Sequence, residues 1–456
     1  MTRAHWSVML VALGALAACG GGEKKRTDSA GASAVTARTA ATTDTAAKCP
    51  GDNAGLTLPA GFCATVFADS LGHARGVVVA ANGDVYVNTW TSKYYPDSVT
   101  PDRTFLVLLR DSTHDGRADV ITRFGATRAK GSTGGTGIAI FKGALYAEAA
   151  DKIVRLALAT DGTAPAGDGV AIVSKLPLSG DHPMHPFVID TGGAIYLDVG
   201  SASNSCQLKN RTLESPGNKP CTELETRAGI WSYDANKTGQ TFSAAGRYAT
   251  GIRNAVGIAI GPGGALYSTQ HGRDQLAESW PKLYSAQQGQ ELPAEELMKI
   301  EKGADYGWPV CYFDNAQKKL VLAPEYGGDG GKAVGECATK KAPVGFFPAH
   351  WAPDGLVFVA SAQVPEHYRS GAFISFHGSW NRAPGPQGGY KVVFVPFTND
   401  APPTPDAMEV FADGFAGGNL DPARAAHRPV GIAIGADGAL YVADDVGGRV
   451  YRITHR

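Results

Sequence analysis

The segment Gly251 to Asp274, GIRNAVGIAIGPGGALYSTQHGRD, contains the pattern on which most of the chain is built. Its centre is an apolar run, a Gly/Pro turn and a second apolar run that ends at Tyr267. Short apolar runs joined by glycine and proline predict a β-hairpin, because these residues supply the backbone angles of tight turns. Polar residues lie at both ends of the hairpin: Arg253, Asn254, Gln270, His271, Arg273 and Asp274. We therefore expect scaffold in its middle and a site at its ends.

The same hairpin pattern recurs along the chain. The segment that begins at Arg428, RPVGIAIGADGALYVADD, repeats it almost letter for letter. Further copies cover 74–89, 135–150 and 185–201, and a looser copy covers 351–379. Hairpin repeats with no helical pattern between them are typical of a β-propeller, although single hairpins of this kind occur in many β proteins. Six copies predict an all-β, six-bladed β-propeller with long loops inserted at its rim.

Two stretches outside the repeats predict a helix and a turn. The segment 293–303, PAEELMKIEKG, is the one helix-like stretch and is expected to lie on the rim and to end at Gly303. The segment Asp111 to Asp119, DSTHDGRAD, resembles the start of a calcium loop, but it lacks the final glutamate and the flanking helices of an EF-hand. A solvated turn between strands is the preferred interpretation.

The N-terminus predicts export. Arg3 precedes a short apolar stretch that ends in Leu16-Ala17-Ala18-Cys19, which resembles a bacterial lipoprotein box in which Cys19 is lipidated. Residues 1–18 are then a lipoprotein signal peptide, and 19–48, rich in Gly, Ser, Thr and Ala, are a flexible tether. The propeller follows at 49–456. We expect a periplasmic or outer-surface lipoprotein that meets the membrane through its lipid only; the alternative is ordinary cleavage with release.

Cysteine usage and net charge fit this compartment. Without Cys19 the chain has six cysteines, and an even number in an exported protein indicates disulfides. Pairing sequence neighbours, a guess from proximity alone, gives Cys49–Cys63, Cys206–Cys221 and Cys311–Cys337. A metal site is disfavoured because CxxC and paired histidines at ligand spacing are absent from the sequence. The net charge of −1 gives no basic field for a nucleic-acid partner.

Polar residues at one equivalent position of several repeats are the main candidates for a site. His182 lies just before the inner strand of its repeat, where a neutral imidazole can accept a proton, with Asp181 beside it to orient it or raise its basicity. His185 is a second candidate, and a purely structural histidine is the alternative. The equivalent positions elsewhere are Arg75, Arg253 with Asn254, and Arg428. Equivalent positions of a propeller converge at one end of its channel.

Two further motifs contain aromatic and polar residues together. In FHGSWNR (376–382), His377, Trp380, Asn381 and Arg382 surround Gly378, which permits close backbone approach. The tryptophan and arginine of this motif can enclose a flat anionic ligand. In DYGWP (305–309), Trp308 is either an aromatic wall of the site or a buried structural residue.

Taken together, these motifs resemble one family. GDH (180–182), GSASNSC (200–206), RNAVG (253–257) and HGRD (271–274), with DYGWP, HGSWNR, GGYKV (388–392) and the Arg428 repeat, are similar to the L-sorbosone dehydrogenase group, relatives of the soluble quinoprotein glucose dehydrogenases. The resemblance covers about residues 58–456. It implies a six-bladed propeller that oxidises a sugar or sugar-derived aldehyde with pyrroloquinoline quinone (PQQ) and calcium.

The resemblance also implies residue roles. His182 would be the base, with Asp181 as its catalytic neighbour, and Arg253 would act in catalysis and in cofactor binding together with Asn254. Gly272 and Arg273 would offer backbone carbonyls to calcium, and Arg428 would pair with a PQQ carboxylate. In FHGSWNR the cofactor contact would fall on His377, Trp380 or Arg382. The chain departs from the glucose enzymes at GSTGGTG (131–137), where those carry a glutamine, so one polar cofactor contact is missing.

These residue types suit the implied chemistry. PQQ is planar with three carboxylates, which matches arginine forks and a hard cation. The electron acceptor would be a cytochrome or a membrane quinone. Two alternatives stay open: a calcium-dependent propeller hydrolase such as a lactonase, which needs a carboxylate-rich channel, and a non-catalytic surface lipoprotein that binds a glycan or a protein.

Overall fold

The computed structural model describes residues 49, 51–91, 104–125, 133–159 and 163–456. The predicted signal peptide (1–18), lipidation site Cys19 and tether (19–48) lie outside the described residues, as does the start of the glycine-rich segment 131–137. Within the described ranges, no helix is long and apolar enough to cross a membrane.

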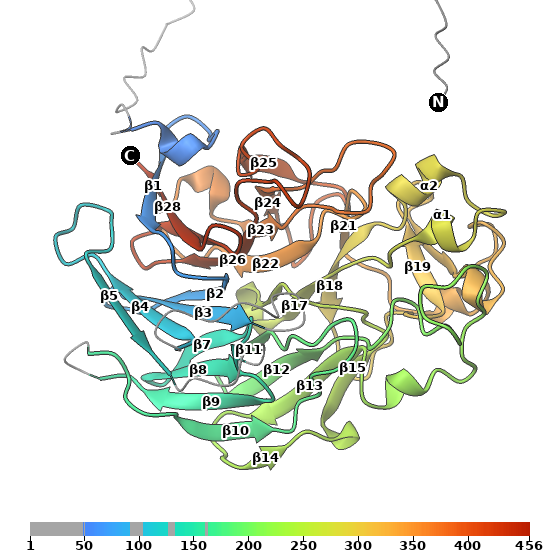
Figure 1. Ribbon diagram of the computed structural model, residues 1–456, viewed down its shortest axis with the longest axis horizontal. Coiled ribbons are helices and arrows are strands. Elements are labelled where there is room, and N and C mark those ends of the chain that lie inside the picture. The colour runs from blue at the N-terminus through green and yellow to red at the C-terminus, as the bar shows by residue number, and fades with distance from the viewer. Residues whose placement is uncertain (1–48, 50, 92–103, 126–132, 160–162) are drawn as a thin grey trace, which may run out of the picture. The chain divides into compact units, whose positions relative to one another are not determined.

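The described residues form six radial β-sheets, so the predicted six-bladed propeller is confirmed (Figure 1). The innermost strand of each blade comes from one of the six sequence repeats. In chain order these strands are β2 (Ala74–Val79), β7 (Ile138–Phe141), β11 (Phe187–Ile189), β16 (Ile258–Ile260), β22 (Pro353–Phe358) and β26 (Pro429–Ile434). The second strands pair antiparallel with them and are β3 (Val85–Thr91), β8 (Ala144–Ala149), β12 (Ala194–Val199), β17 (Leu266–Gln270), β23 (Gly371–Phe376) and β27 (Leu440–Asp444).

Two outer strands complete each blade. The third strands are β4 (Leu106–Arg110), β9 (Lys152–Ala157), β13 (Gly229–Asp234), β18 (Glu295–Ile300), β24 (Lys391–Pro396) and β28 (Arg449–His455). The fourth strands are β5 (Val120–Phe124), β10 (Val170–Ser174), β15 (Arg247–Thr250), β21 (Gly345–Phe347), β25 (Glu409–Ala412) and β1 (Phe62–Ala68). Short β6 (Thr133–Gly134) pairs with β3, and β14 (Gln240–Thr241) pairs with β10. The segment Asp111 to Asp119 joins β4 to β5 and is the expected turn, in which the Asp111 carboxylate accepts bonds from the Asp115 and Gly116 amides.

Glycine recurs in the repeats because the inner strands approach one another closely around the channel. A Cβ on Gly76 would overlap the carbonyl oxygen of Thr136 in the next blade. A Cβ on Gly431 would overlap the carbonyl oxygen of Arg75 in the same way. Any side chain at these positions would push neighbouring blades apart.

The predicted helix at 293–303 is wrong, because this stretch forms strand β18. It pairs with β17 on one side, with Leu266 opposite Ile300, and with β21 on the other. Its residues have good helix propensity, but Leu297 and Met298 are fully buried between neighbouring blades. Burial on both faces of a central strand outweighs a weak local preference. Gly303, the expected helix end, lies in the turn that follows.

The helices lie just before this strand, in an excursion on the rim. They are α1 (Leu276–Ser279) and α2 (Ala286–Glu291), and Ser285 and Gln288 form a capping box at the start of α2. The excursion continues into the hairpin β19 (Cys311–Asp314) and β20 (Lys319–Leu322). Short 3-10 turns elsewhere are Asn53–Gly55, Thr222–Glu225, Ala244–Gly246, Pro262–Gly264, Pro324–Tyr326, Gly335–Thr339 and Glu366–Tyr368.

All three disulfide pairings expected from proximity are present: Cys49–Cys63, Cys206–Cys221 and Cys311–Cys337. The first anchors the start of the described chain to β1, and the other two close loops on the rim. In the chain-entropy account, a loop of about 15 residues closed by a disulfide stabilises the fold by about 3 kcal/mol.

One blade joins the two ends of the described chain. Strand β1 pairs antiparallel with β28, so that Phe62 lies opposite His455 (Figure 1). The Phe62 ring packs edge-on against Tyr368 and Phe411, with centroids at 5.4 and 4.9 Å. The ring of blades is therefore closed by hydrogen bonds and by an aromatic cluster shared with the neighbouring blade.

We expect Phe62→Ala to lower the free energy of unfolding by about 3–5 kcal/mol, because it removes a buried ring at the closing strand. Denaturant unfolding followed by circular dichroism measures this loss. Val410→Ala is the control, since Val410 is 50% exposed on the outer strand β25 and its loss should have little effect. Equal effects of the two substitutions would contradict the closing role of Phe62.

Candidate functional site

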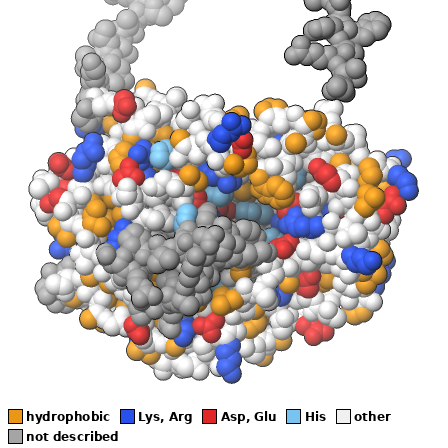
Figure 2. All heavy atoms as spheres, in the orientation of Figure 1, with side chains coloured by type: hydrophobic (Ala, Val, Ile, Leu, Met, Phe, Trp, Pro, Cys, Tyr) orange, Lys and Arg blue, Asp and Glu red, His pale blue; other side chains and the backbone are white. Residues whose placement is uncertain are grey.

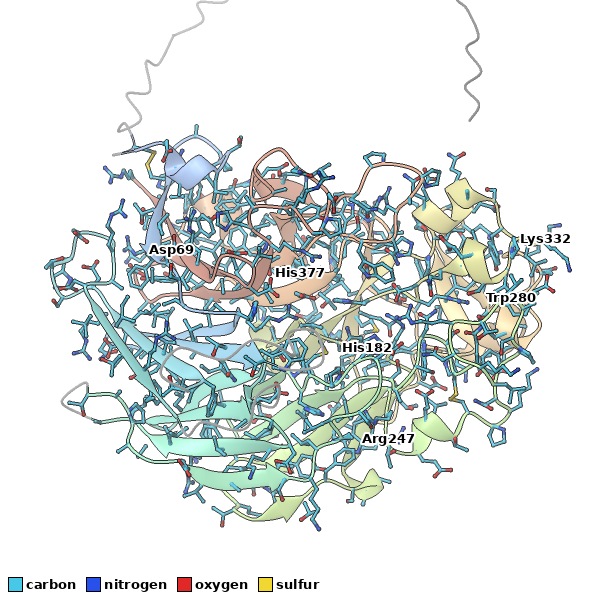
Figure 3. The ribbon with its side chains drawn as sticks, viewed as in Figure 1. Asp69, His182, Arg247, Trp280, Lys332 and His377 are labelled. Carbon is cyan, nitrogen blue, oxygen red and sulfur yellow. A yellow bond between two sulfur atoms is a disulfide. The ribbon has the colours of Figure 1, made fainter. Side chains whose placement is uncertain are left out.

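A cavity of about 610 Å³ opens at the end of the channel where the polar ends of the hairpins converge. Figure 2 shows histidine side chains gathered near the middle of this face, and Figure 3 places His182 and His377 there. A second, smaller cavity is lined by the inner strands of all six blades and shares Arg75, Val256 and Asp354 with the first. The predicted convergence of equivalent positions at one end of the channel is thus observed.

The cavity brings most of the predicted site residues together. Its wall includes Asp181, His182, Arg253, Asn254, Gly272, His377, Trp380 and Arg428. The side chain of Arg273 points elsewhere and forms a buried ion pair with Glu325 at 2.6 Å. Arg382 is not part of this wall either, because its guanidinium donates to the carbonyls of Gln290 and Ala349 and so ties the end of α2 to the loop before β22.

His182 is held as a neutral imidazole with one nitrogen available. Its Nδ1 lies 2.8 Å from the Ser201 carbonyl oxygen, which can only accept, so Nδ1 carries the proton. Within the described part of the chain, Nε2 makes no hydrogen bond and therefore keeps its lone pair. Burial, and then the positive charge of Arg253, hold the pKa of His182 well below its usual value. The residue is placed to accept a proton from a ligand in the cavity.

Asp181 does not orient His182 through a hydrogen bond; Ser201 does. The Asp181 carboxylate instead accepts a bond from Arg211 Nε at 3.1 Å. Its negative charge still favours the protonated form of His182, though less strongly than burial opposes that form. The predicted effect on basicity is therefore electrostatic only.

Arg253 is engaged by the protein at every nitrogen. Nε and Nη2 donate to the backbone and side-chain oxygens of Asn204, Nη1 donates to the Gly272 carbonyl at 3.0 Å, and Nη2 also donates to Asp274 at 2.9 Å. A guanidinium held in this way offers a ligand its flat face and its charge rather than its donors. The Gly272 carbonyl, predicted as a calcium ligand, is one of its acceptors.

Asp274 connects the walls of the cavity. One carboxylate oxygen accepts from both Arg253 and Arg211, at 2.9 and 3.0 Å, and the other accepts from Asn381 at 2.8 Å. Burial alone would raise the pKa of Asp274, but the two guanidinium groups hold it far below its usual range. Loops from three different parts of the chain are thus joined by one carboxylate.

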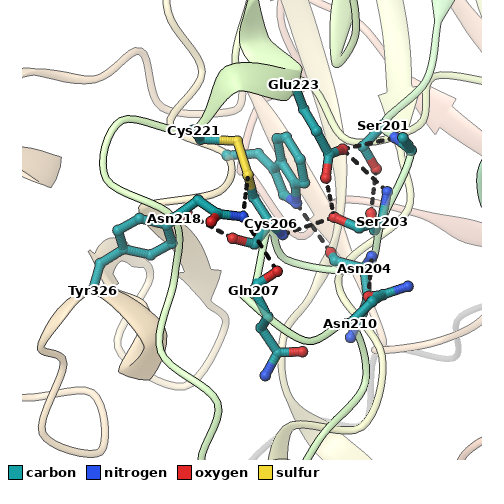
Figure 4. The surroundings of a disulfide bond; sticks show 12 residues. Ser201, Ser203, Asn204, Cys206, Gln207, Asn210, Asn218, Cys221, Glu223 and Tyr326 are labelled. Carbon is teal, nitrogen blue, oxygen red and sulfur yellow. Dashed lines mark hydrogen bonds between the residues drawn. A yellow bond between two sulfur atoms is a disulfide. The ribbon is translucent and has the colours of Figure 1, made fainter.

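The loop that carries Arg211 is closed by the Cys206–Cys221 disulfide (Figure 4). At its base, Asn204 accepts from Arg253 and from Trp308 Nε1, which lies 3.1 Å from the Asn204 carbonyl oxygen. Glu223 binds the backbone and hydroxyl of Ser203. Trp308 is therefore a buried structural residue of the loop's support, and not a wall of the main cavity.

A chain of buried contacts that joins two aspartates to Arg75 and two histidines lies on another wall. Asp354 contacts Arg75 at 3.3 Å and His271 at 2.9 Å, and Asp445 contacts Arg75 at 2.6 Å and His377 at 2.9 Å. Burial opposes protonation of His271, but Asp354 outweighs it and raises the pKa of the imidazole. For His377, burial and then Arg428 dominate, and the pKa is lowered. These pairs fix the two histidines on the wall.

Arg428 differs from the other arginines of the wall because no carboxylate binds its guanidinium in the described residues. Its Nε and Nη2 donate to the carbonyls of His377 and Gly378, at 3.0 and 2.8 Å. Arg75, Arg211 and Arg253 each pair with at least one aspartate. The positive charge of Arg428 is therefore available for an anionic group in the cavity.

Sequence reasoning missed several residues of the wall. Arg211, Glu295 and Asp354 were given no role, yet all three line the cavity, whereas Asp274 was expected at the site only as one of the polar residues at the hairpin ends. Asp354 precedes Gly355 at the position that Arg75 occupies before Gly76, so the alignment of repeats could have found it. Arg211 lies in a loop with no repeat or motif and offers no such signal.

Most of the described chain matches a known protein family. A model of a family described as TrAA12-like matches residues 56–456. The chain belongs to the TrAA12-like family. Its fold is shared with the calcium structure of a family AA12 carbohydrate-active enzyme from Trichoderma reesei, at 19% identity and a TM-score of 0.70, covering 88% of this chain and 97% of that one. The holo PQQ domain of a pyranose dehydrogenase from Coprinopsis cinerea aligns with 20% identity and a TM-score of 0.67, covering 88% and 97%.

Curated relatives match part of this TrAA12-like protein. An uncharacterized protein of Borreliella burgdorferi is 30% identical over 211 residues, which are 45% of this chain and 48% of the relative. A PQQ-dependent pyranose dehydrogenase of Coprinopsis cinerea is 29% identical over 241 residues, covering 44% and 30%. The alignments thus span about half or less of these relatives. The narrower prediction of an L-sorbosone dehydrogenase stays a prediction.

Glu296, behind the site, predicts a pH-dependent stability. Its carboxyl is buried and accepts from Gln270, whose side chain in turn binds the Arg253 amide. Burial raises the pKa of Glu296 from 4.5 to about 8. The folded state thus keeps this proton to higher pH than the unfolded chain, so the contribution to stability is complete below pH 4.5 and is lost as the pH rises through about 8.

We expect Glu296→Gln to reduce the fall in melting temperature between about pH 5 and about pH 9, because the amide cannot ionise. Differential scanning fluorimetry across this range measures it, with the exposed Glu366→Gln as control. An unchanged pH dependence in Glu296→Gln would show that this carboxyl ionises over the same pH range in the folded protein as in the unfolded chain, so that burial does not raise its pKa.

Proposed function

We propose that this protein is a PQQ-dependent oxidoreductase that acts on a sugar or a sugar-derived aldehyde. The observation that carries the proposal is one cavity that contains both a neutral histidine with an available Nε2 and an arginine whose guanidinium has no carboxylate partner among the described residues. Membership of the TrAA12-like family and the partial match to a PQQ-dependent pyranose dehydrogenase support it.

The residues of the cavity fit PQQ in size and in charge. A volume of about 610 Å³ is in the range of small-molecule sites. Arg428 would hold a carboxylate of the cofactor, and the flat face of Arg253 suits a planar ring. Asn254 adds a buried side-chain oxygen that has no partner among the described residues. Bound PQQ would supply a two-electron acceptor for the hydrogen removed from substrate carbon.

In the proposed reaction, His182 acts as the general base. Its Nε2 takes the proton of the substrate hydroxyl, which for an aldehyde is a hydroxyl of its hydrate, while Nδ1 stays bonded to Ser201, so the ring keeps its orientation as it becomes charged. Asp181 and Asp274 favour the imidazolium that results, whereas Arg253 limits its stability. The base can therefore release the proton again before the next turnover.

Calcium, the lipid anchor and the electron acceptor remain proposals. Within the described residues, no group of three His, Cys, Asp or Glu side chains is arranged to hold a metal, so calcium would bind through main-chain carbonyls such as those of Gly272 and Arg273 and through the cofactor. The three disulfides fit a domain at 49–456 that is exported. In this proposal Cys19 carries the lipid anchor, and a cytochrome or a membrane quinone accepts the electrons.

The hydrolase alternative finds less support in the cavity. A lactonase-like site needs carboxylates that are free to hold calcium, yet the carboxylates of this wall are engaged. Asp274 and Asp354 pair with arginine or histidine, and Glu295 accepts from the Gly272 and Ala352 amides. The cavity therefore favours an anionic cofactor over a metal held by side-chain carboxylates.

We expect His182→Ala to lower turnover by about 10²–10⁴-fold, the usual contribution of a general base, while leaving PQQ affinity nearly unchanged. Stopped-flow reduction of the PQQ-loaded protein with a panel of aldoses and aldehydes measures the first effect, and titration of the PQQ absorption measures the second. His367→Ala, an exposed surface histidine, is the control. Wild-type turnover in His182→Ala would remove this residue from the mechanism.

We expect Arg428→Ala to weaken PQQ binding by about 10- to 100-fold, the effect of losing a charge-assisted hydrogen bond of about 1.5–3 kcal/mol. Arg428→Lys should recover part of the affinity because it keeps the charge. Titration of the apoprotein with PQQ measures both, with Arg424→Ala, an exposed arginine of the same loop, as control. Equal affinity in all four proteins would rule out a role for Arg428 in cofactor binding.

A further inference from the structure

Trp380 is an exposed aromatic residue on the wall of the cavity. Its side chain is 51% exposed, although large aromatic side chains are usually mostly buried. In the part of the chain that the structure describes, the indole ring stacks on no other ring and its Nε1 makes no hydrogen bond. An open aromatic face at a cavity is available to a ligand.

The backbone around Trp380 is firmly held. The Ser379 amide donates to the Gly388 carbonyl at 2.8 Å, and the Ser379 hydroxyl donates to Gln387 at 2.7 Å. On the other side, Asn381 donates to Asp274 at 2.8 Å. The residues on both sides of Trp380 are therefore held by hydrogen bonds, and these bonds keep the indole in its exposed position.

Unused polar groups lie on the same wall. Gln275 accepts from Arg211 Nη1 at 3.1 Å through its oxygen, which leaves its amide nitrogen without a partner in the described residues. The side-chain oxygen of Asn381 is buried and has no hydrogen-bond partner within the described ranges. A fixed amide donor, a fixed amide acceptor and an aromatic face on one wall match the hydroxyl groups and the apolar C–H face of a sugar ring.

The charge of this part of the wall favours a neutral ligand. Arg211 donates to Gln275, and its guanidinium also binds both Asp181 and Asp274. An anion there would meet these two carboxylates, whereas a neutral sugar would not. The Arg428 guanidinium, which has no carboxylate partner among the described residues, donates to the His377 and Gly378 carbonyls and is the group proposed for the cofactor carboxylate.

We propose that Trp380, Gln275 and Asn381 form a subsite for a neutral pyranose unit other than the one that is oxidised, so that the preferred ligand is a disaccharide, an oligosaccharide or a glycoside. The proposal rests on the proposed function for the identity of the oxidised unit. Sugar binding at this subsite does not depend on the proposed function, because the three side chains can bind a sugar without PQQ.

The test compares binding of paired sugars to the apoprotein. Isothermal titration calorimetry is carried out with glucose and cellobiose, xylose and xylobiose, and mannose and mannobiose. In at least one pair, we expect the disaccharide to bind about 10-fold more tightly than the monosaccharide. Trp380→Ala should abolish this preference, and Trp380→Phe should keep most of it, since a smaller aromatic face remains. Leu213→Ala, a 61% exposed residue of the disulfide loop, is the matched control and should keep the preference.

Two results would overturn the subsite: equal affinity within every pair, or an unchanged preference in Trp380→Ala. Circular dichroism confirms that each variant is folded. In the PQQ-loaded protein, Trp380→Ala should raise KM for the preferred disaccharide about 10-fold with little change in kcat. If PQQ neither binds nor is reduced, the proposed function fails, whereas the calorimetric preference still decides the subsite.

Discussion

Closure of the ring is the constraint on which the structure depends. Each blade buries both of its faces against neighbours, so a ring left open would expose two apolar faces at once. The chain closes it by pairing β1, from its N-terminal part, with β28 at its end. Because the strands nearest the axis start at one end of the channel, closure also brings residues far apart in sequence, such as Arg75 and Asp445, into direct contact.

The site depends on that convergence and on a small number of shared carboxylates. Asp274 joins the Arg253 hairpin, the Arg211 loop and the segment after β23. Asp354 and Asp445 do the same for Arg75, His271 and His377. Most of the positive charge in the cavity is thus neutralised by aspartates. Arg428 is the exception in the described part of the chain, because its guanidinium donates only to backbone carbonyls and can still bind an anion.

The fold could be predicted because each blade contains one copy of a sequence repeat, whereas the site could be predicted only in part. The hairpin repeats predict the six inner strands. The equivalent positions within them predict the site residues His182, Arg253, Asn254 and Arg428. The strand β18 was mistaken for a helix because local propensity carries no information about burial between blades. The role of Ser201 in orienting His182, and the contribution of Arg211, depend on loop conformations that no pattern in the sequence encodes.

The order of one wall of the cavity depends on the oxidation state of Cys206 and Cys221. Arg211 reaches Asp181 and Asp274 from a loop that this bond closes. In a reducing cytoplasm the loop would lose its closure, and the wall beside His182 would be less ordered. Completion of this wall would then require oxidation of the two thiols, which is the state that cysteines reach in oxidising compartments.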